Sequence, residues 1–176
     1  FRDIEIDPSP RTVTLRRPLI PDLGAVAKGL AIDTAARELK PFENFAIEAG
    51  GDLYMSGTNH HGEPWTIGIR HPRRPGELLE TLRISNQAVC TSGDYERRGL
   101  DGHSHILDPR TGQAADALAS ATVIAPLAMP ADALATAAFV LGPADGLRLL
   151  DRMGLAGILV TPDLGRYETG SLPHAA

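Results

Sequence analysis

Cysteine, basic charge and long apolar runs are scarce in this chain, and each shortage excludes a class of protein or site. Its 176 residues contain one cysteine, Cys90, so an intrachain disulfide and a cysteine zinc cluster are both excluded. Basic residues number 17 against 22 acidic ones, and short pairs such as Arg16–Arg17 indicate a solvated surface rather than a nucleic-acid partner. No apolar run has the length of a membrane span, and no signal peptide is visible.

The composition that remains is that of an ordinary globular domain, with 43% hydrophobic and 22% charged residues. The length is ample for one domain with its own core and short for two. Because no repeat, low-complexity tract or linker interrupts the chain, we expect residues 1–176 to form a single domain. The sequence opens on Phe1 rather than Met, which indicates a processed product or a fragment.

Hydrophobic periodicity predicts both strands and helices. Alternation around Val13 and Leu15 is typical of a half-buried strand, so the segment 1–17 is expected to be an edge of a sheet. Helical spacing of apolar residues predicts a helix over 26–40. Since strands come in runs with helices inserted between them, the predicted fold class is α+β. Further strands are expected at 45–48, 65–69, 78–84, 88–91, 104–107, 121–125 and 157–161, and further helices at 130–141 and 144–153.

The segment from Asp22 to Gly29 has the composition of a phosphate-binding helix start. A glycine followed by small residues lets the backbone approach a ligand closely, and the N-terminus of the following helix attracts anions. Lys28 adds a positive charge. The match to a Walker loop fails, because Gly-Lys-Ser/Thr is lacking at the required spacing. On these residues alone a structural interpretation is favoured, in which Asp22 caps the helix and Gly29 is a packing residue.

Two polar segments that follow the early strands are candidate ligand loops. The first reads Thr91-Ser-Gly-Asp-Tyr95, a composition that ordinary turns share. In the second, His105 is a candidate general base, because histidine titrates near neutrality. His103 and His105 would point to opposite sides of a strand, which does not suit a zinc site. Surface histidines in a loop are an equally good interpretation.

A carboxylate and a hydroxyl share one face of the predicted helix at 130–141. Asp132 and Thr136 are four residues apart, so their side chains are neighbours on that helix. Both supply hard oxygen atoms, the donors that Mg²⁺ takes in proteins. The structural alternative is an aspartate stabilised by the helix dipole and a threonine bonded back to a carbonyl, and locally it is favoured.

Taken in order, these segments resemble the ApbE family, the FAD:protein FMN transferases. The resemblance covers nearly the whole chain and implies a T-fold-related domain with a mainly antiparallel sheet and inserted helices. Family members are longer, with a substantial region before the point where this chain begins. The matching stretches are Asp22-Leu-Gly-Ala-Val-Ala-Lys-Gly-Leu-Ala-Ile-Asp33, Glu48-Ala-Gly-Gly-Asp52, Trp65-Thr-Ile-Gly-Ile-Arg-His-Pro72, Thr91-Ser-Gly-Asp-Tyr95, His105-Ile-Leu-Asp-Pro-Arg-Thr-Gly112 and Ala131-Asp-Ala-Leu-Ala-Thr136.

The resemblance also implies a role for each site residue. His105 would take the proton from the acceptor hydroxyl. Met129 stands where some relatives carry a further acidic group, which predicts a metal site of lower charge. The residues implied to hold Mg²⁺ are Ala25, through its carbonyl, Asp132 and Thr136. The residues implied to contact FAD are Asp22, Lys28, Ser92 and Ile106.

The implied reaction is Mg²⁺-dependent transfer of FMN from FAD to a Ser or Thr hydroxyl of a target flavoprotein, with release of AMP. Two alternatives stay open. One is hydrolysis of FAD to FMN and AMP, and the other is a flavin-binding paralogue without catalysis. The implied location is the bacterial periplasm or the outer face of the inner membrane, with membrane proximity through an N-terminal anchor outside this chain.

Overall fold

The structure, a computed structural model, describes residues 2–95 and 104–174. The helices in these ranges are α1 (Gly24–Glu38) and α2 (Ala128–Met153). The strands are β1 (Ile4–Asp7), β2 (Thr12–Leu15), β3 (Phe45–Ala49), β4 (Asp52–Ser56), β5 (Trp65–Arg70), β6 (Leu78–Ile84), β7 (Gln87–Gly93), β8 (Ser120–Ala125), β9 (Ala156–Val160) and β10 (Arg166–Thr169).

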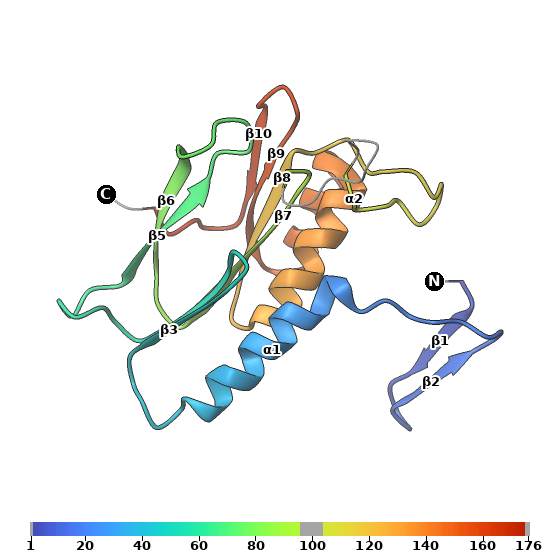
Figure 1. The fold of residues 1–176 in the computed structure, drawn as a ribbon, viewed down its shortest axis with the longest axis horizontal. Helices are drawn as coiled ribbons and strands as arrows, with labels where there is room; N and C mark the ends of the chain where they lie inside the picture. Colours follow the sequence, from blue (N-terminus) through green and yellow to red (C-terminus); the bar gives the residue numbers. More distant parts are fainter. Residues whose placement is uncertain (1, 96–103, 175–176) are drawn as a thin grey trace.

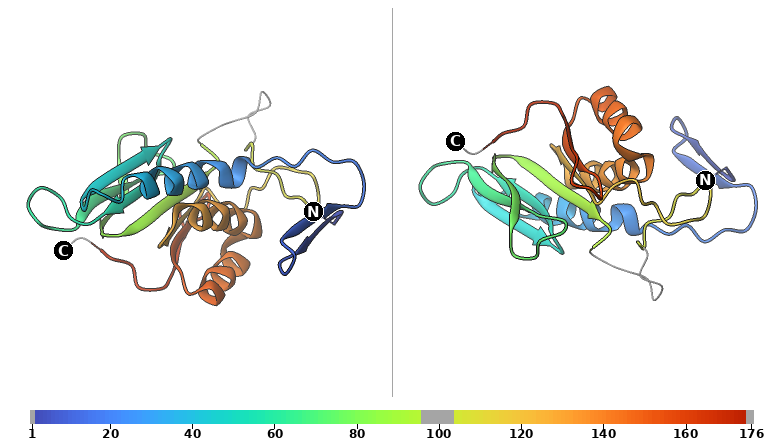
Figure 2. Two further views of the ribbon diagram at one scale, coloured as in Figure 1. Left: turned by 90° about the horizontal axis from the view of Figure 1, so that it is seen from below. Right: turned by 90° about the horizontal axis from the view of Figure 1, so that it is seen from above.

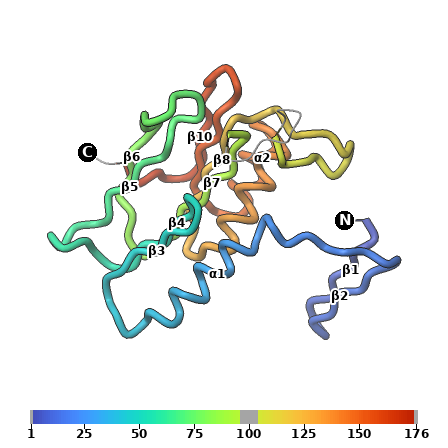
Figure 3. The backbone as a smooth tube through the Cα atoms, viewed as in Figure 1, coloured from blue at the N-terminus to red at the C-terminus, as the bar shows by residue number. Residues whose placement is uncertain are grey.

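The centre of the fold is a six-stranded sheet in the order β10-β9-β8-β7-β4-β3. Every neighbouring pair of strands in it is antiparallel. Both helices lie on one face of this sheet, and the β5–β6 pair covers part of the other face (Figures 1 and 3). The predicted α+β class with an antiparallel sheet is therefore confirmed.

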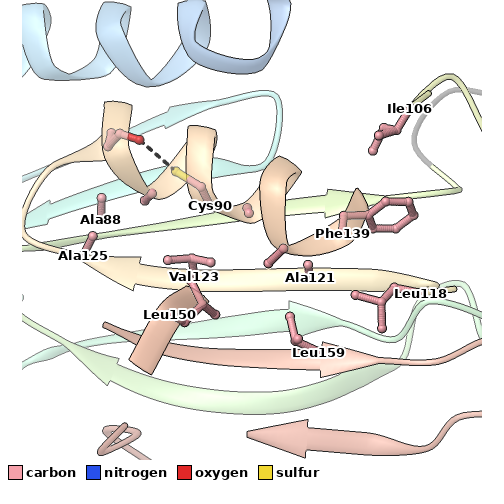
Figure 4. Packing of buried hydrophobic residues seen from close by; sticks show 14 of the residues in the cluster. Ala88, Cys90, Ile106, Leu118, Ala121, Val123, Ala125, Phe139, Leu150 and Leu159 are labelled. Atoms are coloured by element: carbon pink, nitrogen blue, oxygen red, sulfur yellow. Dashed lines mark hydrogen bonds between the residues drawn. The ribbon is translucent and has the colours of Figure 1, made fainter. Parts of the chain in front are cut away.

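Small side chains line the sheet in the core between it and the helices, next to larger ones such as Phe139 and Leu150. Alternate residues of β7 and β8, among them Cys90 and Val123, are buried against α2 (Figure 4). The Cys90 thiol donates to the Ala128 carbonyl oxygen at 3.6 Å. Burial, with the charge of Asp52 as a further cause, raises the pKa of this thiol far above its usual value. Because α2 presents alanines to the sheet, its backbone lies close to the strands: Ala128, Ala131, Ala135 and Ala138 are all fully buried.

The opposite face of the sheet is covered by larger aliphatic side chains. Leu82 and Ile84 of β6 are fully buried there. Period-two alternation in β5 turns Ile67 and Ile69 inward, as the sequence predicts. The residues of the main sheet that meet them are Met55, Val89, Ile124, Ile158 and Val160.

The long helix α2 bends at Gly142. This residue has φ 79° and ψ −178°, outside the helical region, and Pro143 follows it. Gly142 therefore interrupts α2, and its two parts correspond to the separate helices predicted at 130–141 and 144–153. By length and mean hydropathy alone α2 is also long and apolar enough to cross a membrane, unlike any run expected from the sequence. In this fold it packs along the sheet, as the core helix of a globular domain does.

The β1–β2 hairpin stands apart from the main sheet (Figures 1 and 2). Its strands pair only with each other in the described part of the chain, with Ile6 opposite Val13. The prediction that residues 1–17 form an edge of a sheet is wrong in this respect, because they build a separate two-stranded sheet. Alternation alone identifies a strand and does not identify its neighbours.

Three elements differ from the sequence prediction. The strand expected at 104–107 is wrong: Ser104 and Leu107 make only isolated bridges, and the chain turns back so that Leu107 pairs with Ala114. Strands β4 and β10 were not predicted. The first starts directly after the Gly50–Gly51 turn, and the second is short, polar and mostly exposed at the sheet edge.

Candidate active site

The candidate site lies where the N-terminal part of α1 touches the first turn of α2. A Cβ atom on Gly29 would lie 2.5 Å from the Ala128 carbonyl oxygen, so only glycine permits this approach of the two helices. Asp33 of α1 accepts hydrogen bonds from the amides of Ala128 at 2.7 Å and Met129 at 2.9 Å. It therefore caps the start of α2 from the neighbouring helix.

Asp132 makes the reciprocal contact from α2 to α1. Its Oδ2 atom accepts a hydrogen bond from the Gly29 amide at 3.0 Å. In a regular helix the amide four residues after Ala25 points at the Ala25 carbonyl oxygen. The Asp132 carboxylate therefore contacts α1 at the Gly29 amide, which faces the Ala25 carbonyl. Ala25 is one of the three residues implied to hold a metal.

The Asp132 side chain is 4% exposed, and its charge is poorly solvated. Burial raises the pKa of this carboxyl above its usual value, and the charge of Asp52 acts in the same direction. The Gly29 amide and the Lys28 ammonium oppose this change without cancelling it. A desolvated carboxylate of this kind favours a bound cation.

Thr136 lies one turn further along α2 and joins the helix to the main sheet. Its hydroxyl exchanges a hydrogen bond with the hydroxyl of Ser92 at the end of β7, at 2.9 Å. Thr136 and Ser92 come from distant parts of the sequence, and the resemblance implies different ligands for them. Their contact places the residues implied for metal and for FAD next to each other.

The oxygen donors here suit Mg²⁺ in kind. They are one carboxylate, one hydroxyl and one main-chain carbonyl, all hard ligands. In the described part of the chain, no group of three or more His, Cys, Asp or Glu side chains could hold a metal ion. A Mg²⁺ ion at this seam would depend on Asp132 for protein charge, with Thr136 and Ala25 as neutral donors.

Asp52 is a site residue to which the sequence assigned no role. It is 1% exposed at the start of β4, and it forms an ion pair with Lys28. Its Oδ1 atom also accepts the Thr91 amide at 3.2 Å. Although burial lowers the pKa of Lys28, the hydrogen bond and charge of Asp52 outweigh it and the net pKa is raised. The motif Gly50-Gly51-Asp52 could have indicated this role, because a turn there places the aspartate at the first position of a buried strand.

Asp22 sits just before α1, and its role as a capping residue is modest. Leu23 occupies the capping position and makes no side-chain cap bond. Asp22 Oδ1 accepts the Gly24 amide at 2.7 Å and so shapes the approach to the helix. The exposed Asp22 carboxylate is available to a ligand at the same end of α1 as Lys28.

His105 and Ile106 are the second and third described residues after the gap at 96–103. His103 falls within that gap and is outside the described residues. The His105 side chain is exposed, whereas Ile106 is 8% exposed and belongs to the core on the helix side of the sheet. Ile106 also holds the segment in place, because its carbonyl accepts the Ala115 amide at 2.9 Å. An exposed histidine beside an anchored neighbour is accessible to a large ligand.

A small cavity of about 40 Å³ opens close to Lys28, beneath the Gly50–Gly51 turn. Both glycines have positive φ, 59° and 91°, and a Cβ on Gly50 would lie 4.0 Å from the Lys28 side chain. The cavity lies on the β5–β6 side of the main sheet, and the Gly50–Gly51 turn separates it from Lys28. Its walls are formed by Leu53, Ile67, Gly68, Ile69, Arg70, Val89, Thr91 and Tyr95.

The structure defines an α+β domain built on an antiparallel sheet, and comparison with known proteins gives its family. The ApbE family model matches residues 1–159, and the chain belongs to this family. It is 35% identical to the FAD:protein FMN transferase of Haemophilus influenzae over 169 residues, which are 89% of this chain and 49% of that protein. It is also 35% identical to the protein of that name from Escherichia coli K12, over 87% of this chain and 46% of that one.

Solved structures agree with this assignment. The ApbE protein of Thermotoga maritima superposes with a TM-score of 0.83 at 35% identity, over 96% of this chain and 57% of that one. The flavin transferase ApbE of Vibrio cholerae superposes with a TM-score of 0.80 at 32% identity, over 97% and 56% of the two chains. The chain therefore spans about half the length of the relatives that it matches.

Proposed function

We propose that this chain carries out, or forms the core of a protein that carries out, transfer of FMN from FAD to a hydroxyl of a target protein. One observation carries the proposal. The reciprocal contacts between α1 and α2 bring Asp132 close enough to Lys28 for their charges to interact. The Ser92–Thr136 hydrogen bond joins the end of β7 to the same helix, α2. Curated relatives at 35% identity are named for this reaction.

In the proposed mechanism, Lys28 and the first amides of α1 bind the pyrophosphate of FAD by charge and hydrogen bonding. Asp52 holds the Lys28 ammonium in place and keeps it protonated. Ser92 and Asp22 contact the dinucleotide from the strand end and from the segment before α1. These contacts orient the phosphorus atom on the FMN side toward the acceptor.

His105 takes the proton from the acceptor Ser or Thr hydroxyl as its oxygen attacks that phosphorus. The bond from the phosphorus to the bridging oxygen breaks, and AMP leaves with that oxygen. Asp132, Thr136 and the Ala25 carbonyl would hold Mg²⁺, which supplies Lewis-acid neutralisation of the phosphoryl oxygens when bound. The exposure of His105 suits an acceptor that is itself a folded protein.

The same proposal covers organisation and location. Residues 1–176 are taken as one ApbE-like domain, supported by the family match over residues 1–159. The family resemblance supports a periplasmic location or one at the outer face of the inner membrane, and a target flavoprotein there as partner.

The test incubates the protein with FAD, Mg²⁺ and a candidate acceptor, and follows both covalent flavin and AMP. We expect His105→Ala to lower adduct formation by about 10²-fold or more, the usual contribution of a positioned base, while FAD binding stays measurable. His61→Ala is the matched control, because it removes an exposed histidine from the loop between β4 and β5. Adduct at the wild-type rate from His105→Ala would remove this residue from the mechanism. AMP without adduct would indicate hydrolysis, and neither product would indicate a binding module.

A further inference from the structure

An ion pair with fork geometry connects the β5–β6 layer to the end of β7. The Arg73 guanidinium donates to Asp94 through both terminal nitrogens, Nη1 to Oδ1 at 2.7 Å and Nη2 to Oδ2 at 2.7 Å. The two side chains are 29% and 21% exposed. Such a two-pronged, partly buried pair is geometrically specific, unlike an ordinary surface ion pair.

Both partners are fixed through their own backbones. The Arg73 amide donates to Nδ1 of His71 at 3.1 Å, and His71 is 7% exposed within the turn that joins β5 to β6. The Asp94 amide donates to the Ala119 carbonyl oxygen at 3.1 Å. The ion pair therefore connects two ordered backbone segments, so its formation requires no further ordering of the backbone.

The segment held by this pair carries several contacts of the candidate site. Ser92, two residues before Asp94, is bonded to Thr136 on α2. The Thr91 amide is bonded to Asp52, the partner of Lys28. A Cβ on Gly93 would lie 2.6 Å from the ring of Tyr95, so the chain folds tightly back on itself after the strand. Thr91 and Tyr95 also line the cavity.

We propose that Arg73 is a positioning residue, which acts through Asp94 to hold residues 91–95 against α2 and over the cavity. The proposal rests on the proposed function, because the ligand that this segment would contact through Ser92 is FAD. Arg73 comes from the sheet on the far side of the strand from α2, so the two layers hold the segment from opposite sides. Without the pair, the strand end keeps its bond to α2 and loses its anchor to the β5–β6 turn.

The first test is amide hydrogen exchange in a peptide covering residues 88–95, measured on the whole chain without FAD. We expect Arg73→Lys, which keeps the charge and loses the fork, and Asp94→Asn to speed exchange there about tenfold. Arg83→Lys is the matched control, since Arg83 pairs with Glu63 at 3.0 Å elsewhere on the β5–β6 pair. Unchanged exchange in both variants would overturn the proposal. So would faster exchange spread evenly over the whole chain.

The second test separates positioning from a loss of folded protein. For adduct formation, we expect Arg73→Lys to raise KM for FAD about fivefold and to change kcat less than twofold. A lower kcat with unchanged KM would mean fewer active molecules and would contradict positioning. The double variant with Arg73→Asp and Asp94→Arg should recover part of the loss. If the wild type forms no adduct, the proposed function fails, and the exchange experiment still decides the role of Arg73.

Discussion

At the scale of single residues, the close contact between α1 and α2 depends on a glycine, Gly29, which has no side chain. Gly29 lets α1 lie directly on the first turn of α2, and its amide reaches the Asp132 carboxylate. A side chain on Gly29 would meet the main chain of Ala128 and Met129. Main chain moves less readily than the end of a flexible side chain. A methyl group at this position must therefore push the helices apart.

We predict that Gly29→Ala lowers the free energy of unfolding by about 1–3 kcal/mol, the usual cost of overpacking, despite alanine's better helix propensity. Gly24→Ala is the control in the same helix, because a Cβ there meets only the Asp22 side chain, at 3.0 Å. Urea unfolding of the two variants measures the difference. Equal stability of both variants would show that the helix contact is looser than described.

Residue patterns predicted local features of the site and not its long-range contacts. Spacing alone predicted that Asp132 and Thr136 are neighbours on one helix, where the structure places them. The partners of these residues could not, because Gly29 and Ser92 reach them through the tertiary fold. The buried role of Asp52 was hidden for the same reason, and so was the pairing of two turn residues, Arg73 and Asp94.

At the scale of secondary-structure elements, alternation and turn residues identified most of the strands. β5 was predicted because Trp65, Ile67 and Ile69 alternate with polar or small residues, and β6 was expected at the bounds where it is found. β4 was missed because its burial does not alternate, and β10 because it is polar and exposed. Residues 104–107 looked like a strand, and the Asp108–Gly112 turn folds them back instead.

A second ion pair joins the β5–β6 pair to the main sheet, at the edge strand β10. Arg166 of β10 donates to Glu80 of β6 at 2.7 Å. The hydrogen bond from Arg166 lowers the pKa of the Glu80 carboxyl below its usual 4.5, against the opposing effect of burial. A lowered pKa means that the folded state binds the proton less tightly than the unfolded chain does. The stabilisation is therefore present at neutral pH and is lost as the pH falls through the folded-state pKa.

We predict that Glu80→Gln lowers the free energy of unfolding by about 0.5–1 kcal/mol at pH 7, a modest value because the pair is partly solvated. The difference from wild type should begin to shrink as the pH falls below 4.5 and should disappear below the lowered folded-state pKa, where the wild-type carboxyl is also neutral. Glu77→Gln, which removes an exposed partner of Arg74 beside the same strand, is the control. A difference between Glu80→Gln and wild type that stays constant with pH would show that charge is not its cause.

At the scale of the whole molecule, the site combines a helix from the early part of the sequence with one from the late part. α1 comes early and α2 late, and they meet over the strands between them. The β1–β2 hairpin, whose β2 residues are all exposed, lies apart from this assembly (Figure 2). The chain matches about half the length of its relatives, so the proposed transfer has to be measured on this chain itself.

The most direct test of the central claim is a Mg²⁺ titration of covalent flavin transfer by wild type and by Asp132→Asn. Asparagine keeps an oxygen that can accept the Gly29 amide and removes the carboxylate to which the proposed mechanism assigns the metal. We predict that the half-maximal Mg²⁺ concentration rises at least about tenfold, since a cation held by one charged ligand loses most of its attraction. Superimposable titration curves would contradict the account, because they would show that no cation acts at this seam.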